Sequence, residues 1–238
     1  GSQAYTAVFA GDQTADYMGL QQVVSALLSS ASSGIHIWGS DIGGMHKSST
    51  AAEYDPELYA RWLGFATFSP LMRSHAQRGF TDPWEYDNNG SSVANFQKYY
   101  WTRENITDLV YSGTIKARSE NVPMTQAMVI AYPKQTKLAN NSTQYLFCEQ
   151  LLVCPVTEEK VSYVDVQFPE GRWVDLWDGT VYEGGQTVKV NATLEKIPVF
   201  VKEGGAFPVT YGEDLDIGTI STVDKNINAL IVTPSNSK

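Results

Sequence analysis

The chain has 238 residues, a formal net charge of −9 and a hydrophobic fraction of 42%. This length allows one large domain or two smaller ones, and the hydrophobic fraction suits a packed core. The negative charge disfavours a nucleic-acid partner, because phosphate binding requires a basic face, and no apolar run is long enough to predict a membrane span.

The first half of the chain alternates buried strands with amphipathic helices. Apolar residues recur with helical spacing in three segments, and the second of these begins with Pro56, a residue favoured in the first helical turn. A strand–helix alternation at this spacing predicts parallel β/α units. The predicted strands are 4–10, 34–41 and 124–132, with a short extended segment at 69–75, and the predicted helices are 15–31, 56–68 and 93–118.

The second half has a different pattern. From about residue 144 onward, short apolar strands are separated by Gly, Pro and Asp turns, and no helical spacing is found. This pattern is typical of an antiparallel β sandwich. The predicted fold is therefore α/β followed by all-β. The predicted domains are a β/α part at 1–140, a β-sandwich domain at 141–210, and the start of a further β module or a tail at 211–238.

The β/α part is too short to close on itself as a barrel. A (β/α)8 TIM barrel needs eight units and about 250 residues, whereas three parallel strands alone leave unpaired edges. The alternatives are a small three-layer sheet and the last part of a barrel. The second is favoured because the chain begins directly with a strand, so we expect strands 4–10 and 124–132 each to pair with another polypeptide.

Asp12 follows the first predicted strand, within the stretch FAGDQTADY at 9–17. Two interpretations of this carboxylate remain open. It is either the N-cap of the following helix, where an Asp accepts hydrogen bonds from free N–H groups, or a catalytic acid at the carboxyl end of a barrel strand. The local sequence alone favours the cap.

Further polar residues fall at the ends of the next extended segments. Asp41 ends the second strand, and Arg73 and His75 lie near the end of 69–75. Each has a structural explanation on its own, such as a turn or a surface ion pair. Because loops at the carboxyl ends of parallel strands converge on one mouth, Asp12, Asp41, Arg73 and His75 together favour a polar ligand site.

Two other patterns bear on the environment of the protein. Cys148 and Cys154 are predicted to be unbonded core residues, since a single strand would hold them about 20 Å apart. Asn-x-Ser/Thr sequons exceed the roughly two expected by chance, which favours a secreted glycoprotein. The sequons are at Asn89, Asn105, Asn140, Asn141 and Asn191.

Six motifs resemble those of glycoside hydrolase family 31, in the order and at the spacing of that family. They are GDQ at 11–13, GSDIGG at 39–44, FSPLMRSH at 68–75, QLLVCPV at 150–156, GRWVDLWDGTVYEGG at 171–185 and IPVFVKEGGAFP at 197–208. The family includes α-glucosidases, α-xylosidases, sulfoquinovosidases, α-glucosyltransferases and α-glucan lyases. The resemblance implies the last part of a (β/α)8 TIM barrel followed by β-sandwich domains.

The resemblance also implies roles for individual residues. Asp12 matches the general acid/base of the family. Met45 stands where many α-glucosidases have an aromatic residue, so it leaves the sugar preference open. No metal and no organic cofactor are implied. The residues expected to bind the terminal sugar are Asp41, Arg73, His75, Trp38 and Met45.

The nucleophile of the family is missing from this sequence. It is an aspartate in a motif such as DMNE or DGNE, and neither occurs in the 238 residues. We therefore expect a complementary N-terminal chain to supply it. The implied activity is retaining hydrolysis of a terminal α-linked glycoside or oligosaccharide. The alternatives are an α-glucosyltransferase, an α-glucan lyase, or a non-catalytic carbohydrate-binding fragment.

Overall fold

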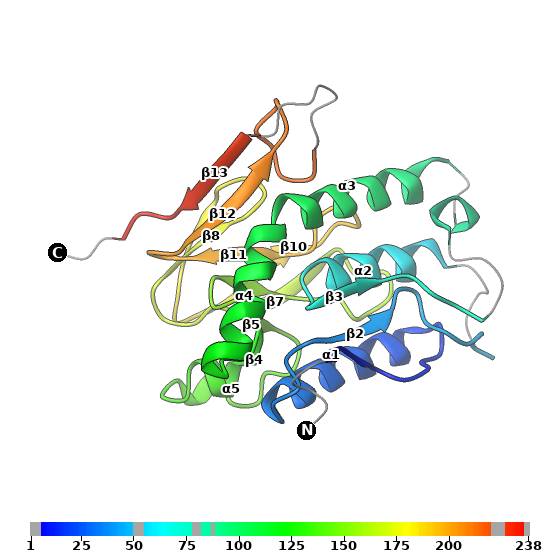
Figure 1. Ribbon diagram of the computed structural model, residues 1–238, viewed down its shortest axis with the longest axis horizontal. Helices are drawn as coiled ribbons and strands as arrows, with labels where there is room; N and C mark the ends of the chain where they lie inside the picture. The colour runs from blue at the N-terminus through cyan, green and yellow to red at the C-terminus, as the bar shows by residue number, and fades with distance from the viewer. Residues whose placement is uncertain (1–5, 50–54, 78–81, 87–88, 220–226, 236–238) are drawn as a thin grey trace.

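A computed structural model describes residues 6–49, 55–77, 82–86, 89–219 and 227–235 of the chain. It combines a parallel sheet and its helices with a larger antiparallel part. Figure 1 shows the blue and cyan elements of the first part toward the right and the yellow and orange strands of the second part toward the left.

The parallel sheet has three strands in the order β1-β2-β3. β1 (Val8–Phe9) and β3 (Leu71–Arg73) both pair in parallel with the central β2 (Trp38–Asp41). Among the described residues, β1 and β3 therefore each have a strand neighbour on one side only. The segment predicted as short and extended is thus the third parallel strand.

Four longer helices lie in this first half of the described chain, and the first two contact the parallel sheet. They are α1 (Tyr17–Ser32), α2 (Pro56–Thr67), α3 (Ser91–Asn105) and α4 (Thr107–Glu120), with a short 3₁₀ turn, η2, at Pro83–Tyr86. The segment 93–118 was predicted as one helix but forms two, because the chain breaks helical geometry at Ile106, where φ is −99° and ψ is 13°. The Ile106 side chain is fully buried at this break. No Gly or Pro marks the position, so helical spacing alone did not reveal it.

The prediction of a parallel strand at 124–132 was wrong. Only β4 (Thr125–Ala127) is extended, a one-turn helix α5 (Met128–Ala131) follows, and β4 pairs antiparallel with β5 (Tyr145–Phe147). A short apolar run is compatible with either kind of sheet, since burial on both faces gives the same pattern. The division of the chain at residues 140 and 210 stays a prediction.

The antiparallel part contains no helix in the continuously described range 139–219. A six-stranded sheet has the order β4-β5-β6-β11-β8-β9, and two-stranded sheets pair β10 with β7 and β12 with β13. A 3₁₀ turn, η3, lies at Thr136–Leu138. The remaining strands are β6 (Leu151–Val153), β7 (Tyr163–Gln167), β8 (Arg172–Asp175), β9 (Val181–Glu183), β10 (Thr187–Asn191), β11 (Val199–Lys202), β12 (Ala206–Tyr211) and β13 (Ile227–Val232).

The centre of the six-stranded sheet, at β5, β6 and β11, is buried on both faces. Successive side chains of a strand point to opposite faces, and along β6 the middle residue, Leu152, joins the cluster that contains Val166 and Val190 of the β10–β7 pair. Its neighbours Leu151 and Val153 join the larger cluster with the helices. This sheet therefore packs against the helical part on one side and the β10–β7 pair on the other.

The two cysteines lie in a hairpin rather than in one strand. Cys148 and Glu149 have φ values of 47° and 61° and form the turn between β5 and β6. The assumption of a single strand was wrong, but the expectation of unbonded core cysteines is confirmed, because Cys148 and Cys154 are both free and buried. Burial raises the pKa of the Cys148 thiol to about 12.

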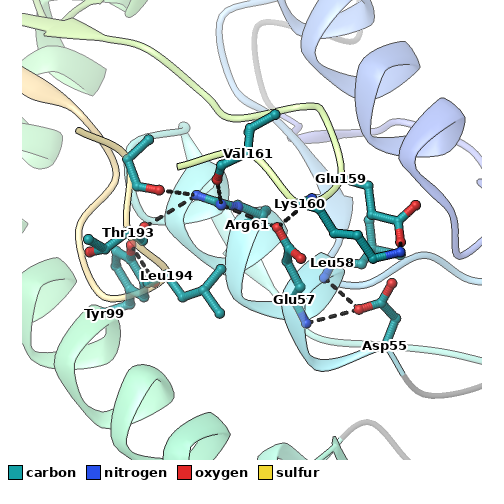
Figure 2. Close-up of polar contacts among 11 residues, drawn as sticks. Asp55, Glu57, Leu58, Arg61, Tyr99, Glu159, Lys160, Val161, Thr193 and Leu194 are labelled. Carbon is teal, nitrogen blue, oxygen red and sulfur yellow. Dashed lines mark hydrogen bonds and ion pairs between the residues drawn. The ribbon is translucent and has the colours of Figure 1, made fainter. Parts of the chain in front are cut away.

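Arg61 of α2 attaches this helix to the antiparallel part, as Figure 2 shows. Its side chain is 6% exposed, and its guanidinium donates to Ala192 O at 2.9 Å and Val161 O at 2.7 Å and pairs with Glu57 at 3.2 Å. Ala192 and Val161 lie on different loops of the antiparallel part, so the buried Arg61 side chain joins the two parts of the molecule. In the same view, the hydroxyl of Tyr99 from α3 donates to Leu194 O at 3.2 Å.

One of the predicted sequons is not available for modification in this fold. Asn105 is 4% exposed, and its amide nitrogen donates to Thr210 O at 2.6 Å. Secretion stays a prediction. None of the helices within the described ranges has the length and apolarity that crossing a membrane requires.

Candidate active site

The carboxyl ends of β1, β2 and β3 bring polar side chains to one edge of the parallel sheet. Asp41 is the last residue of β2 and Arg73 is the last residue of β3, and the two are directly paired in register. Asp12 lies three positions beyond the end of β1. The parallel direction of the strands thus places these residues at the same edge, as their sequence positions predicted.

Backbone hydrogen bonds tie the loops that follow these strands to one another. Gln13 O accepts from Met45 N at 2.8 Å and from His46 N at 2.9 Å, and Ala15 N donates to His46 O at 2.8 Å. Gln77 N, which follows β3, donates to Met45 O at 3.1 Å. The loop that contains Met45 and His46 is therefore held between its two neighbours.

Gly44 allows this close approach. Its φ is +84°, and a Cβ added to it would lie 2.7 Å from Thr14 O and 2.7 Å from Ala15 Cα. Both obstacles are backbone atoms, so no side-chain rotation relieves the contact. Only glycine meets both the backbone conformation and the spacing at this position.

Replacing Gly44 with alanine should lower the free energy of unfolding by about 2–4 kcal/mol, from left-handed strain and steric overlap together. Gly34→Ala is the matched control, since Gly34 has the same φ of +84° and nothing within 4 Å of an added Cβ. We expect that control to lose only about 1–2 kcal/mol. Urea unfolding measures both variants, and equal losses would contradict the packing of the Gly44 loop.

Asp12 is not the helix cap. The N-cap of α1 is Asp16, whose Oδ1 accepts from Gly19 N at 2.7 Å and whose Oδ2 accepts from the Ser48 hydroxyl at 2.9 Å. Asp12 instead forms an ion pair with His46, with Oδ2 3.2 Å from Nε2, and both side chains are nearly half exposed. The cap interpretation of Asp12 was wrong, and its carboxylate remains accessible to a ligand.

Asp41 lies beneath Arg73. The Arg73 Nε is 2.8 Å from Asp41 Oδ1, and the Arg73 side chain is 43% exposed while that of Asp41 is 1% exposed. The 2.8 Å separation is that of an ion pair without hydrogen-bond geometry, and among the described residues neither Asp41 oxygen has a hydrogen-bond partner. The Arg73 guanidinium also lies 4.6 Å from the centroid of the Phe9 ring.

Burial raises the pKa of the Asp41 carboxyl above its ordinary value, although the positive charges of Arg73 and His75 oppose this. Asp12 adds a small contribution in the same direction as burial, because a second negative charge disfavours ionisation. Arg73, His75 and Asp12 are thus each close enough to affect the Asp41 carboxyl electrostatically. His75 is exposed, two residues beyond Arg73.

The remaining predicted residues are placed differently. The backbone of Met45 takes part in the loop contacts, and its side chain is partly buried. Trp38 is 2% exposed and belongs to the core cluster. It is three residues from Asp41 and therefore on the opposite face of β2, the face on which Ser40 accepts from Trp62 Nε1 of α2 at 3.2 Å. The structure does not bring Trp38 to the edge where Asp41 lies.

Two residues at this edge were not predicted. His46 contacts Asp12 and Phe9 contacts Arg73. Phe9 lies in the segment 4–10, which was predicted as a buried strand, yet it is 39% exposed. The alternation of side chains along a strand predicts to which face of the sheet Phe9 points, but it does not predict whether other residues bury that face. His46 follows a Gly-Gly turn, and its direction depends on backbone contacts between loops that are distant in sequence.

Two sequence-family models match the chain. Residues 1–113 match the glycosyl hydrolases family 31 TIM-barrel domain, and residues 121–207 match the glycosyl hydrolase family 31 C-terminal domain. Together they include all the residues placed at the edge of the parallel sheet and most of the antiparallel strands.

The chain is also similar in sequence to individual proteins. The chain is 31% identical over 228 residues to the isomaltosyltransferase of Sporosarcina globispora, with 92% of this chain and 20% of that protein covered. It is 32% identical over 206 residues to the sulfoquinovosidase of Escherichia coli strain K12, with 85% of this chain and 30% of that protein covered.

The structure is similar to that of the cycloalternan-forming enzyme from Listeria monocytogenes in complex with a pentasaccharide substrate. The TM-score is 0.88 at 29% identity, with 95% of this chain and 22% of that chain covered. The chain thus spans between 20% and 30% of the length of these relatives. By both family models and these relatives, the chain belongs to glycosyl hydrolase family 31.

Proposed function

We propose that this chain is the C-terminal part of a retaining α-glycosidase. In this proposal β1, β2 and β3 are the last strands of a (β/α)8 barrel, and the strands from β4 onward form a β sandwich. Within the described ranges β1 and β3 each lack a second strand neighbour, which supports the proposal because a closed barrel requires a neighbour on each side. A complementary N-terminal part would supply the other barrel strands and the nucleophile.

The observation that carries the proposal is the accessible Asp12 carboxylate at the same edge as Arg73 and His75. Retaining glycosidases need two carboxyl groups about 5–5.5 Å apart. Asp12 protonates the glycosidic oxygen as the nucleophile forms a bond to the anomeric carbon. The same residue then takes a proton from water as that water breaks the covalent intermediate.

Arg73 and His75 are the residues that meet the sugar first. Both side chains are accessible, whereas the Asp41 carboxylate lies behind the Arg73 guanidinium. Asp41 therefore acts in one of two ways. Either it holds Arg73 in place, or Arg73 rotates away and the Asp41 carboxylate accepts a hydrogen bond from a sugar hydroxyl. An α-linked oligosaccharide or glycoside is the proposed substrate.

Transfer to a sugar acceptor is the second candidate function. The relatives named isomaltosyltransferase and 1,6-alpha-glucosyltransferase favour it, at 31% and 26% identity. Both reactions use the same glycosyl intermediate, and they differ in whether water or a sugar hydroxyl attacks it. Lyase action and a non-catalytic carbohydrate-binding role are the remaining alternatives.

Product analysis tests the proposal. The chain, combined with the complementary barrel part, should act on an aryl α-glucoside and release the α-anomer first, seen by NMR before mutarotation. Longer oligosaccharides that increase with added acceptor would favour transfer, and an unsaturated or anhydro product would favour lyase action. The chain alone should not turn over the substrate. Turnover by the chain alone would contradict the need for a complementary part, and β-anomer release would contradict retention.

A further inference from the structure

The turn between α2 and β3, residues 67–70, has an unusual set of partners. Each of its four successive carbonyl oxygens accepts a hydrogen bond from a side chain that is distant in sequence. These carbonyls belong to the end of α2 and the residues just after it, where intrahelical partners are missing. β3 begins at the next residue, Leu71.

Arg103 of α3 satisfies three of these carbonyls. Its Nη1 donates to Thr67 O at 2.9 Å and Ser69 O at 2.6 Å, and its Nη2 donates to Pro70 O at 2.9 Å. Burial lowers the pKa of this guanidinium to about 10. A positive charge at a helix C-terminus is also favourable with respect to the helix dipole. The planar fork of arginine holds three acceptors at fixed spacing, which the single ammonium of lysine does not do.

Tyr145 of β5 satisfies the fourth carbonyl. Its hydroxyl donates to Phe68 O at 2.9 Å, and its side chain is fully buried. Tyr145 belongs to the six-stranded sheet, whereas Phe68 belongs to the parallel part. The antiparallel part therefore reaches directly to the segment from which β3 begins.

The position of this turn affects the position of Arg73, which lies only three residues beyond Pro70. β3 spans only Leu71–Arg73, and two of these residues lead from the turn to Arg73. A shift of the turn along the strand direction would move Arg73 with it. The 2.8 Å contact with Asp41 and the 4.6 Å contact with the Phe9 ring would then both change.

We propose that Arg103 and Tyr145 are positioning residues that fix the start of β3 and so hold Arg73 against Asp41 and Phe9. Their effect on catalysis rests on the proposed function, in which Arg73 contacts the sugar. Their effect on β3 does not depend on that function. The antiparallel part thereby contributes to the geometry of the site, although Asp12, Asp41, Arg73 and His75 all lie in the parallel part.

Tyr145→Phe is the variant that tests this role, because it removes one hydroxyl and leaves the ring in place. Tyr99→Phe is the matched control. Tyr99 is also fully buried, and its hydroxyl donates to Leu194 O at 3.2 Å and accepts from Ile197 N at 2.9 Å, away from β3. Hydrogen exchange of peptide 66–77 in the chain itself should become about tenfold faster in Tyr145→Phe and remain unchanged in the control.

The catalytic consequence is measured in the assembled enzyme by a double-mutant cycle with Arg73→Ala. Tyr145→Phe should lower kcat/KM by about tenfold, since small misplacements of a binding group are costly. In the Arg73→Ala background the same change should cost less than about twofold, because the two residues act through one contact. Tyr99→Phe should leave kcat/KM unchanged in both backgrounds.

Two results would contradict the positioning role of Tyr145, and a third would contradict the proposed function. Equal exchange of peptide 66–77 in both tyrosine variants would show that Tyr145 does not position β3. An identical loss of kcat/KM in both Arg73 backgrounds would show a general structural effect. Faster exchange in Tyr145→Phe, together with a wild-type assembled enzyme that has no glycosidase activity, would overturn the proposed function and support the positioning of β3.

Discussion

Replacing Asp12 with alanine should nearly abolish cleavage of glycosides with an alkyl or sugar leaving group and should spare much of the activity on an activated aryl glycoside. A poor leaving group needs a proton as the glycosidic bond breaks, whereas an acidic phenol does not. General acid catalysis contributes about 10²–10⁴-fold. We therefore expect a loss of this size in kcat/KM for the first substrate, measured by steady-state kinetics of the assembled enzyme, and a far smaller loss for the second.

Azide provides a second measurement on the same variant. Breakdown of the covalent intermediate by water needs Asp12 as a base, but an anionic nucleophile such as azide does not. Added azide should restore turnover of the aryl substrate and give a glycosyl azide of retained configuration. Absence of rescue, with both substrates affected alike, would remove Asp12 from the acid/base role.

Asp16→Ala is the matched control for this experiment. Asp16 lies four residues later and caps α1 through Gly19 N, whereas Asp12 pairs with His46. Losing a cap costs about 0.5–2 kcal/mol of stability, so Asp16→Ala should lower the melting temperature without discriminating between the two substrates. The two variants therefore separate a catalytic carboxylate from a structural one within the same loop.

The sequence predicted which polar residues share one edge of the parallel sheet, because strand direction is a strong constraint. Once strands 4–10 and 34–41 were taken as parallel, Asp12 and Asp41 had to lie at the same edge. The contact between Arg73 and Asp41 follows from the third strand, which is only three residues long. The antiparallel part was also predicted, since turns recur at regular intervals from about residue 144.

What the sequence did not predict depends on contacts between distant segments. The strand pairing of β4 is set by β5, twenty residues later, and not by its own apolar run. Asp16 and Asp12 both precede α1, and only the backbone geometry of the loop decides which of them caps the helix. Trp38 was taken from a resemblance, although its spacing from Asp41 already places the two on opposite faces of a strand.

Replacing Asp41 with asparagine should lower kcat/KM by about 10²-fold, equivalent to about 2.7 kcal/mol, a loss within the range of interactions that involve a charged group. The loss is expected whether Asp41 holds Arg73 or accepts a sugar hydroxyl itself, because either role needs the negative charge. Asp175→Asn is the activity control. Burial also raises the pKa of the Asp175 carboxyl, but Asp175 lies in β8 of the antiparallel part. We therefore expect Asp175→Asn to leave kcat/KM unchanged.

The same Asp41→Asn change should make the fold more stable at neutral pH. Because the folded protein holds the Asp41 pKa above its unfolded value, mainly through burial, the ionised carboxylate destabilises the fold at every pH above the folded pKa. Asparagine resembles the neutral form, so the stability gained by the variant should be largest near pH 7. This gain should fade as the pH drops through the usual titration range of an aspartate, where Asp41 is protonated in both the folded and the unfolded wild type.

Urea unfolding of both proteins at several pH values measures this gain, and a destabilised Asp41→Asn variant at pH 7 would mean that the attraction of Arg73 and His75 outweighs burial. A gain in stability combined with a loss in activity would instead identify Asp41 as a residue that costs the fold free energy and is needed for the site.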